Sequence, residues 1–247
     1  MKILLANSNT SRAVTAAILA EAQKFASSGT EVTGKNAEFG AEIIGTRAEA
    51  AVAAHGLVDM LAKHAAGYDA VVIGMSLDTG IWAAREMLDI PVVAMSEAAM
   101  LMAATAASRF GLVIFGNRGA QAYREVVEGY GFDGRLVGIE ALGAAPQDML
   151  ADPESLYTPI VEGVERLANE QDAEAVVLVG AVMCGLPAIL QDRVSVPLLE
   201  GISCGILLAE SLVRLGLTKP KIGSLQPVPA RKVSGLSQHL TGFFERS

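Results

Sequence analysis

Positively charged residues and cysteines are both scarce in this chain. Among its 247 residues, 19 lysines and arginines stand against 27 aspartates and glutamates, and the formal net charge is −8. Surfaces that bind nucleic acid need clustered positive charge, so we expect no nucleic-acid partner. The two cysteines, Cys184 and Cys204, are too few to form a disulfide framework.

Long hydrophobic runs are also lacking. No stretch approaches the roughly 18 consecutive apolar residues of a transmembrane helix. The first apolar run, residues 3–6, gives way to a polar segment and is too short for the core of a signal peptide. We therefore expect a cytoplasmic protein that has no membrane partner.

Motifs that hold cofactors are missing as well, whereas core-forming residues are abundant. Neither the cysteine and histidine spacing of zinc sites nor a glycine-rich nucleotide motif occurs, so we expect no metal and no other cofactor. Hydrophobic residues make up 51% of the chain, which is enough for one large domain or two small ones. This apolar composition is also compatible with a homo-oligomer.

Apolar runs typical of buried strands alternate with helical patterns along the chain. Strands are predicted at residues 3–6, 70–73, 92–95, 112–115, 175–179 and 197–199. Helices are predicted at residues 11–25, 46–65 and 158–169, where apolar side chains recur with the period of an α-helix. Residues 143–154 are polar and irregular, which predicts a surface loop. The alternation is typical of an α/β fold with parallel sheets covered on both faces.

The chain also repeats itself, which is its most informative feature. Residues 69–93 match residues 174–199: each segment has a buried strand, a sharp loop, a helix and a second buried strand. One constant offset pairs Met75 with Gly180 at the two loops. Two similar halves that face each other would place these paired loops on opposite walls of a cleft.

We therefore predict two pseudo-symmetric halves, each a parallel sheet with helices on both faces, and a cleft between them. The first half is predicted to comprise residues 1–95 together with residues 204–247, and the second half residues 96–203. Because no low-complexity linker separates the halves, we expect them to be tightly joined.

Four loops are the candidate binding site, because ligands of parallel α/β sheets bind outside the carboxyl ends of the strands. These loops are residues 7–11, 74–80, 116–119 and 180–185. Each leads into a helix N-terminus, where free N–H groups favour carboxylates and enolates. The residues expected to contact a substrate are Asn7, Asn9, Thr10, Ser11, Met75, Thr79, Asn117, Gly180, Ala181 and Val182. The Asn, Ser and Thr side chains among them are equally typical of helix caps.

The order of these motifs resembles the aspartate/glutamate/hydantoin racemase superfamily, and most of all its hydantoin-racemase branch. Residues 7–11, Asn-Ser-Asn-Thr-Ser, are similar to the Asn-Pro-Asn-Thr-Ser signature of that branch. Residues 78–86 followed by residues 90–93 resemble its first active-site segment, and segments within residues 181–202 resemble its second. The match spans almost the whole chain in the same order.

This resemblance implies a cofactor-independent enzyme with two cysteines, one from each half, on opposite faces of the substrate. One thiolate removes a proton from a carbon next to a carbonyl, and the other thiol returns a proton. In this chain Met75 and Gly180 stand at the two corresponding positions, and neither has an ionisable side chain. The two-thiol mechanism therefore does not carry over.

Three residues are candidates to replace the missing pair. Cys184 lies near a predicted helix N-terminus, which would lower the pKa of its thiol, but a buried packing role is equally compatible. Ser76 is either a hydrogen-bond donor to substrate or a turn residue. Asp78 is either a general base or a helix cap.

A further residue, Arg118, is a candidate for substrate binding. It either binds a carboxylate or lies on a solvated loop.

Three functions remain open at this point. The first is a cofactor-independent racemase or epimerase that acts at a carbon next to a carbonyl, with an atypical acid/base set. The second is one-base enolate chemistry, such as decarboxylation, cis–trans isomerisation or hydrolysis. The third is a non-catalytic protein that binds a small anion. The expected partner is a hydantoin-like or amino-acid-like small molecule that carries a carboxylate or a cyclic imide.

Overall fold

The first half of the molecule is built on a parallel sheet of four strands. The structure is a computed structural model that describes residues 1–217 and 219–245. The strands of this sheet lie in the order β2-β1-β3-β4. Their bounds are β1 (Lys2–Asn7), β2 (Glu31–Asn36), β3 (Ala70–Ile73) and β4 (Val92–Ala94).

The second sheet repeats this arrangement. Its strands are also parallel and lie in the order β6-β5-β7-β8. Their bounds are β5 (Phe110–Phe115), β6 (Leu136–Leu142), β7 (Ala175–Leu178) and β8 (Leu198–Glu200). Since β3 and β7 hold the same place in their sheets, the predicted duplicated α/β architecture is confirmed.

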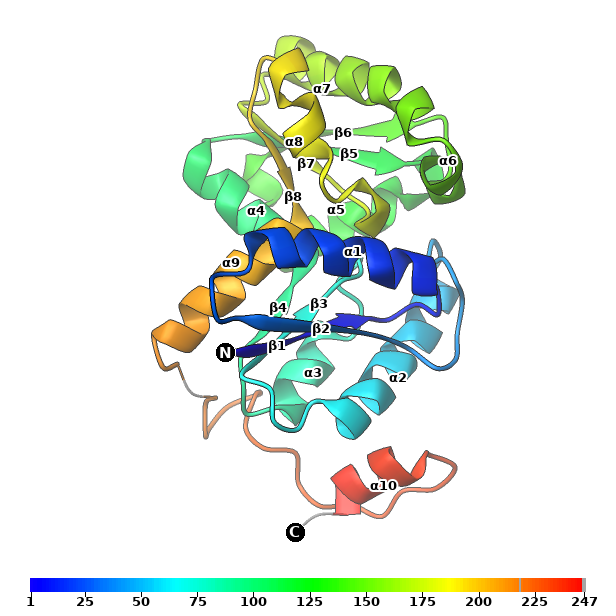
Figure 1. Cartoon of the computed structure of the whole chain (residues 1–247), viewed down its shortest axis with the longest axis vertical. Helices are drawn as coiled ribbons and strands as arrows, with labels where there is room; N and C mark the ends of the chain where they lie inside the picture. The colour runs from blue at the N-terminus through cyan, green and yellow to red at the C-terminus, as the bar shows by residue number, and fades with distance from the viewer. Residues whose placement is uncertain (218, 246–247) are drawn as a thin grey trace.

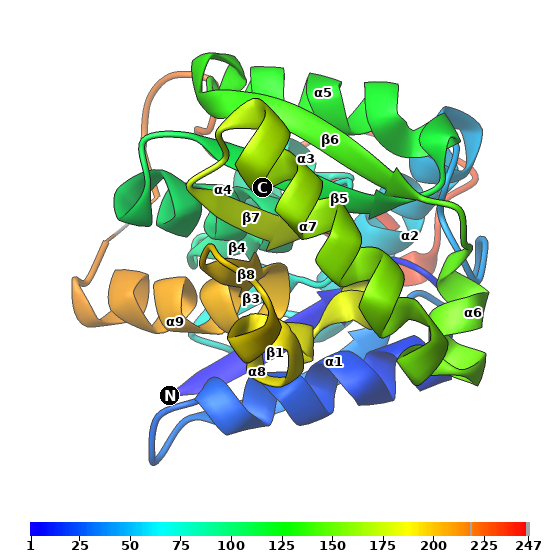
Figure 2. The same cartoon turned by 90° about the horizontal axis from the view of Figure 1, so that it is seen from above.

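Helices cover both sheets. Their bounds are α1 (Arg12–Phe25), α2 (Arg47–His64), α3 (Ile81–Met87), α4 (Met95–Ala106), α5 (Ala120–Gly129), α6 (Pro146–Ala151), α7 (Tyr157–Gln171), α8 (Leu186–Leu190), α9 (Gly201–Arg214) and α10 (Gln238–Glu245). Figure 1 shows the second sheet above the first, with α10 at the foot of the molecule, where it packs against α2. Seen from above, α7 lies over the second sheet (Figure 2).

The two halves share one apolar core. A cluster of buried side chains joins Leu5 and Ile18 of the first half to Phe110 and Val177 of the second. Helix α9 packs on β3 and β4, helix α4 packs on β7 and β8, and the two helices pack against each other. The halves are therefore held together by continuous packing between their sheets.

The predicted domain boundaries stay a prediction. The strands of each sheet lie on their own side of the boundaries at residues 95 and 203, whereas α4 and α9 contact each other across them. Residues 218 and 246–247, which the predicted first half includes, lie outside the described residues.

Two edge strands, β2 and β6, were not predicted, whereas the other two edge strands, β4 and β8, were. β2 has a single buried residue, Val32, and β6 has two, Gly138 and Leu142. An edge strand pairs on one side only and can form without a continuous buried apolar run, which β2 and β6 lack and β4 has.

The predicted surface loop over residues 143–154 is wrong, because this segment contains α6 and a following 3₁₀ turn. Pro146 occupies the first turn of the helix, where proline is favoured. The carboxylate of Asp148 accepts the N–H of Ala145 at 2.8 Å, and Met149 is buried against the second sheet. A proline and a capping acid thus start a helix in a segment that looks irregular in sequence.

The starts of α4 and α9 meet where the halves join. Gly201 is the first residue of α9, and a Cβ atom there would stand 2.6 Å from the carbonyl oxygen of Met95, the first residue of α4. A side chain at this position would have to displace backbone. Glycine therefore sets how closely the two helices approach.

Replacing Gly201 by alanine should destabilise the protein by ~2 kcal/mol or more, because overpacking against backbone cannot be relieved by a rotamer change. Urea unfolding measures the change in the free energy of unfolding. Gly134→Ala is the control, since a Cβ atom there would meet nothing within 4 Å. Equal stability of the two variants would contradict this account of the helix contact.

Candidate functional site

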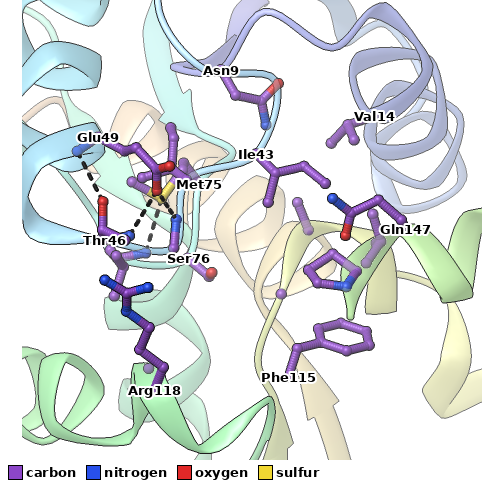
Figure 3. Close-up of a pocket in the computed structure, with 18 of the residues that line it drawn as sticks. Asn9, Val14, Ile43, Thr46, Glu49, Met75, Ser76, Phe115, Arg118 and Gln147 are labelled. Atoms are coloured by element: carbon purple, nitrogen blue, oxygen red, sulfur yellow. Dashed lines mark hydrogen bonds between the residues drawn. The ribbon is translucent and has the colours of Figure 1, made fainter. Parts of the chain in front are cut away.

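A cavity of about 390 Å³ opens between the two halves. Its lining comes from the loops that follow β1, β2 and β3 in the first half and β5, β6 and β7 in the second. Parallel strands end at the same edge of a sheet, so both sheets direct their carboxyl-end loops into one space. Figure 3 shows this site.

The loop after β1 holds one amide group firmly at the cavity. The side-chain nitrogen of Asn7 donates to Asn9 Oδ1 at 2.8 Å and to Thr15 Oγ1 at 3.0 Å. The N–H of Ser11 also donates to Asn9 Oδ1, at 2.9 Å. Because the oxygen of Asn9 is occupied, its amide nitrogen is left as a donor, and it points toward Ile43 (Figure 3).

The loop after β3 presents Met75 and Ser76 to the cavity. Met75 is buried, and its sulfur accepts the N–H of Leu77 at 3.1 Å. The hydroxyl oxygen of Ser76 lies 2.7 Å from that of Tyr123, and burial raises the pKa of Tyr123 to about 12. This hydroxyl pair is therefore uncharged at neutral pH, and it joins a loop of the first half to α5 of the second.

Asp78 belongs to the same loop but does not line the cavity. Its buried carboxylate accepts the N–H groups of Ser96 at 3.0 Å and Glu97 at 2.9 Å, both in the first turn of α4. It also accepts the hydroxyl of Tyr130 at 3.0 Å. Burial raises the pKa of Asp78 to about 7, although these three hydrogen bonds favour the charged form. The side chain caps α4 and ties it to α5.

The loop after β7 forms the opposite wall. Ala181 and Val182 begin a short 3₁₀ turn that lines the cavity, and within residues 1–217 and 219–245 their N–H groups donate to no backbone carbonyl. Gly180 has a φ of 142°, which residues with a side chain rarely adopt. A Cβ atom on Gly180 would stand 3.2 Å from the ring of Phe115. The conformation of the second loop therefore requires glycine at position 180.

Two charged side chains are found among the described residues of the lining, Glu49 and Arg118. Glu49 Oε2 accepts the N–H groups of Gly45 and Thr46, each at 2.9 Å, and these bonds lower the pKa of Glu49. Arg118 is exposed, forms no ion pair in the described part of the chain, and extends toward Thr46 in Figure 3. The lining therefore carries one carboxylate, held by backbone N–H groups, and one guanidinium, whose charge also contributes to lowering the pKa of Glu49.

Cys184 lies outside the cavity lining. Burial, and then the nearby carboxylates of Glu200 and Glu21, raise the pKa of its thiol to about 12. The expected lowering of this pKa is wrong, because the desolvation of the thiolate outweighs any effect of the short helix that follows. The catalytic role of Cys184 stays a prediction, and its surroundings disfavour it.

The structure divides the predicted site residues into two groups. Those that line the cavity are Asn9, Met75, Ser76, Gly180, Ala181 and Val182. Those that do not are Asn7, Thr10, Ser11, Asp78, Thr79, Asn117 and Cys184. Several of the second group still support the first: Asn7 and Ser11 hold Asn9, and Ser11 also caps α1 by accepting the N–H of Val14 at 3.3 Å. Asn117 is exposed, whereas Thr79 is half-buried.

Sequence patterns missed the lining residues that follow the edge strands. Ile43 and Thr46 come after β2, and Gln147 comes after β6. Recognising these two strands would have pointed to both loops, because their carboxyl ends face the same cavity. Tyr123 comes from the interior of α5, and no local pattern indicates that it reaches the opposite half.

Two features are absent from the described residues. Within residues 1–217 and 219–245, no group of three or more His, Cys, Asp or Glu side chains is arranged to hold a metal ion. No helix in this part of the chain is both long and apolar enough to span a membrane.

Asp78 should make the protein less stable as the pH rises from about 4 to about 7. The unfolded carboxyl loses its proton near pH 3.8, whereas the folded one keeps it to about pH 7. The folded state therefore binds more protons in this window, so the free energy of unfolding falls across it by a few kcal/mol.

Asp78→Asn has no proton to release and should lack this part of the pH slope. Asparagine tolerates the left-handed backbone of this position, where φ is 49°. Urea unfolding between pH 4 and 8 measures both slopes, and Asp133→Asn at an exposed position is the control. Parallel slopes for wild type and Asp78→Asn would contradict the raised pKa of Asp78.

Comparison with known proteins identifies the relatives of this fold and site. The chain is 30% identical over 223 residues to the hydantoin racemase of Pseudomonas sp. (strain NS671), with 90% of each chain covered. The allantoin racemase of Pseudomonas fluorescens superposes with a TM-score of 0.92 at 31% identity, over 95% of this chain and 100% of that one. The allantoin racemase of Klebsiella pneumoniae gives a TM-score of 0.93 at 31% identity, over 98% and 99% of the two chains.

The family-level match agrees with these pairwise likenesses. The sequence profile described as "Asp/Glu/Hydantoin racemase" matches residues 3–209, which include both sheets and every loop of the cavity. This chain belongs to the Asp/Glu/hydantoin racemase family.

Proposed function

We propose that the chain is a cofactor-independent isomerase that moves a proton at a carbon next to a carbonyl of a hydantoin-like compound. The cavity between the halves carries this proposal, because the paired loops after β3 and β7 line it from opposite sides. Hydantoin and allantoin, after which the relatives are named, are small cyclic compounds with a carbon acid beside a carbonyl. A cavity of about 390 Å³ is large enough for such a ring.

Hydrogen-bond donors at the cavity suit the enolate that such a reaction forms. Removal of the carbon-bound proton moves negative charge onto the carbonyl oxygen, and fixed donors aimed at that oxygen lower the barrier. The amide nitrogen of Asn9 and the N–H groups of Ala181 and Val182 are donors that line the cavity. They come from both halves, so the packing of the two halves against each other brings these donors together.

A side chain for proton transfer is assigned on one face of the substrate only. Ser76 is the candidate on the first-half side, since its hydroxyl lines the cavity and is held by Tyr123. Its oxygen would accept the carbon-bound proton while its own proton is passed on to water. On the opposite wall, Gly180, Ala181 and Val182 carry no titratable side chain. Water is therefore the proton source on that face. A proton delivered by water on that face inverts the carbon, whereas a proton returned on the Ser76 face restores the original configuration. Hydrogen exchange therefore counts both events and inversion counts only the first.

Exchange of the carbon-bound hydrogen in heavy water tests the assignment. Wild type should exchange it in a 5-substituted hydantoin or in allantoin, and exchange should outpace inversion of configuration. Ser76→Ala should slow exchange by ~100-fold, the usual contribution of one positioned proton-transfer group. Proton NMR measures exchange, and optical rotation measures inversion.

Cys184→Ala is the matched control, because it also shortens a small side chain to a methyl group, at a position that does not line the cavity. It should exchange at the wild-type rate. Undiminished exchange in Ser76→Ala would remove Ser76 from the mechanism. Loss of exchange in Cys184→Ala alone would restore the thiol as the acid/base group.

A second candidate function is binding without turnover. The observation that favours it is the pair Met75 and Gly180, which put no ionisable side chain at the two symmetry-related loop positions. In that case hydantoins would raise the melting temperature of the protein while their carbon-bound hydrogen stayed unexchanged.

We infer that the ligand presents oxygen acceptors, and that a carboxylate is favoured over a neutral imide. The lining includes hydrogen-bond donors, and Arg118 adds a positive charge that contributes to lowering the pKa of Glu49. Glu49, by contrast, already accepts two backbone N–H groups. Guanidinium groups bind carboxylates through two parallel hydrogen bonds, which a neutral carbonyl cannot match.

Arg118→Gln should weaken binding of hydantoin-5-acetate by about tenfold and leave binding of unsubstituted hydantoin unchanged, because only the first carries a carboxylate. Isothermal titration calorimetry at low and high salt measures both dissociation constants. Arg124→Gln, at an exposed position of α5 outside the lining, is the control. Equal loss for both ligands would exclude a carboxylate contact.

A cytoplasmic location and a homo-oligomeric state are also part of this proposal. Large apolar side chains such as Trp82, Leu101 and Ile189 are exposed on the single chain, and burial between copies would remove them from water. Sedimentation velocity measures the oligomeric state directly.

A further inference from the structure

Two tyrosines of one helix reach across to a single loop of the opposite half. Tyr123 lies in α5 and Tyr130 follows its last turn, seven residues later, so both project from the same side of the helix. Tyr123 bonds to Ser76 at 2.7 Å, and Tyr130 donates to Asp78 at 3.0 Å. The loop that carries Ser76 is therefore held at two points by the second half.

Asp78 connects this loop to a third element. Its carboxylate accepts the N–H groups of Ser96 and Glu97 at the start of α4, and the hydroxyl of Ser96 donates to the carbonyl oxygen of Ser76 at 2.6 Å. Asp78 has a left-handed backbone with a φ of 49°, which aspartate adopts when local hydrogen bonds support it. Removing one donor from this carboxylate would leave a buried charge less well satisfied.

Charged and titratable groups surround Asp78 on each element packed against it. Glu97 of α4 forms two hydrogen bonds with Arg85 of α3, one of them at 3.2 Å. The guanidinium carbon of Arg85 lies 5.1 Å from the ring centre of Trp82. On the α5 side are the two tyrosines and Glu125, which borders the same groove as Asp78 and forms an ion pair with Arg47. Trp82, the one tryptophan of the chain, thus stands at the end of a chain of contacts that begins at Asp78.

We propose that Tyr130 is a positioning residue that acts through Asp78 to hold the β3–α3 loop, and with it the hydroxyl of Ser76, in place at the cavity. The expected effect on catalysis rests on the proposed function, whereas the link between Tyr130 and the loop is independent of it. The second half then sets the geometry of a first-half group. Separation of the halves would release Ser76 at the same time as it opened the cavity.

Fluorescence of Trp82 tests the link without any substrate. Trp82 and Tyr130 border the same groove beside Asp78, so the emission of Trp82 should follow the ionisation of Asp78. Wild type should show a transition near pH 7, where the carboxyl of Asp78 titrates. Tyr130→Phe should move this midpoint upward, because the carboxylate loses a donor that favours its charged form. Tyr157→Phe is the control and should titrate like wild type, since Tyr157 starts α7 and does not border the groove.

The effect on catalysis is tested with the same protein variants, by measuring exchange of the carbon-bound hydrogen of a hydantoin in heavy water. Tyr130→Phe should reduce the turnover rate several-fold, leave KM unchanged, and shift the pH profile of the rate in the same direction as the fluorescence midpoint. A structural brace alone would lower stability and move the fluorescence midpoint without moving the pH profile of the rate.

The outcomes separate this inference from the proposed function. An unchanged fluorescence midpoint in Tyr130→Phe overturns the link, whether or not the enzyme turns over. A shifted midpoint in proteins that never exchange substrate leaves the link standing and removes the isomerase proposal. A Tyr130→Phe chain that does not fold would make Tyr130 a folding residue and would overturn its role as a positioning residue.

Discussion

A carboxylate taken out of water has to receive its hydrogen bonds from the protein, and this constraint on Asp78 organises the centre of the molecule. The donors come from the first turn of α4 and from Tyr130 of the second half. Satisfying one buried acid therefore brings together the β3–α3 loop, the helix that leads into the second half, and α5. The wall of the cavity that carries Ser76 is built on this meeting point.

The duplicated architecture produces two walls that differ in chemistry. On the first wall, the side chains of Met75 and Ser76 fill the loop, and Ser76 is bonded across to Tyr123. On the second, the backbone of Gly180 adopts a φ of 142° and the ring of Phe115 takes the neighbouring space. Backbone N–H groups, rather than a side chain, are what that loop offers. Pseudo-symmetry of the fold thus coexists with an asymmetric set of functional groups.

Family membership identifies the relatives of this chain. The residues that line the cavity determine which chemistry it can perform. The family match rests on sequence similarity along most of the chain, over residues 3–209. The chemistry depends on a few positions at the loop tips, where Met75 and Gly180 cannot ionise and Cys184 is held with a raised pKa. Function is set by these side chains and by the donors around them, so it has to be argued from the site itself.

The sequence by itself determined the α/β class, the duplication and the central strands, because buried parallel strands need continuous apolar runs and the repeat matches them in order. It also indicated Asn9, Ser76 and the residues after β7, because the carboxyl ends of parallel strands meet at one edge. Only the tertiary structure decided that Asp78 caps a distant helix, that Cys184 is shielded beside two carboxylates, and that Tyr123 and Tyr130 cross between the halves. Those contacts join residues far apart in the chain. Burial and hydrogen-bond partners of that kind leave no local pattern in a sequence.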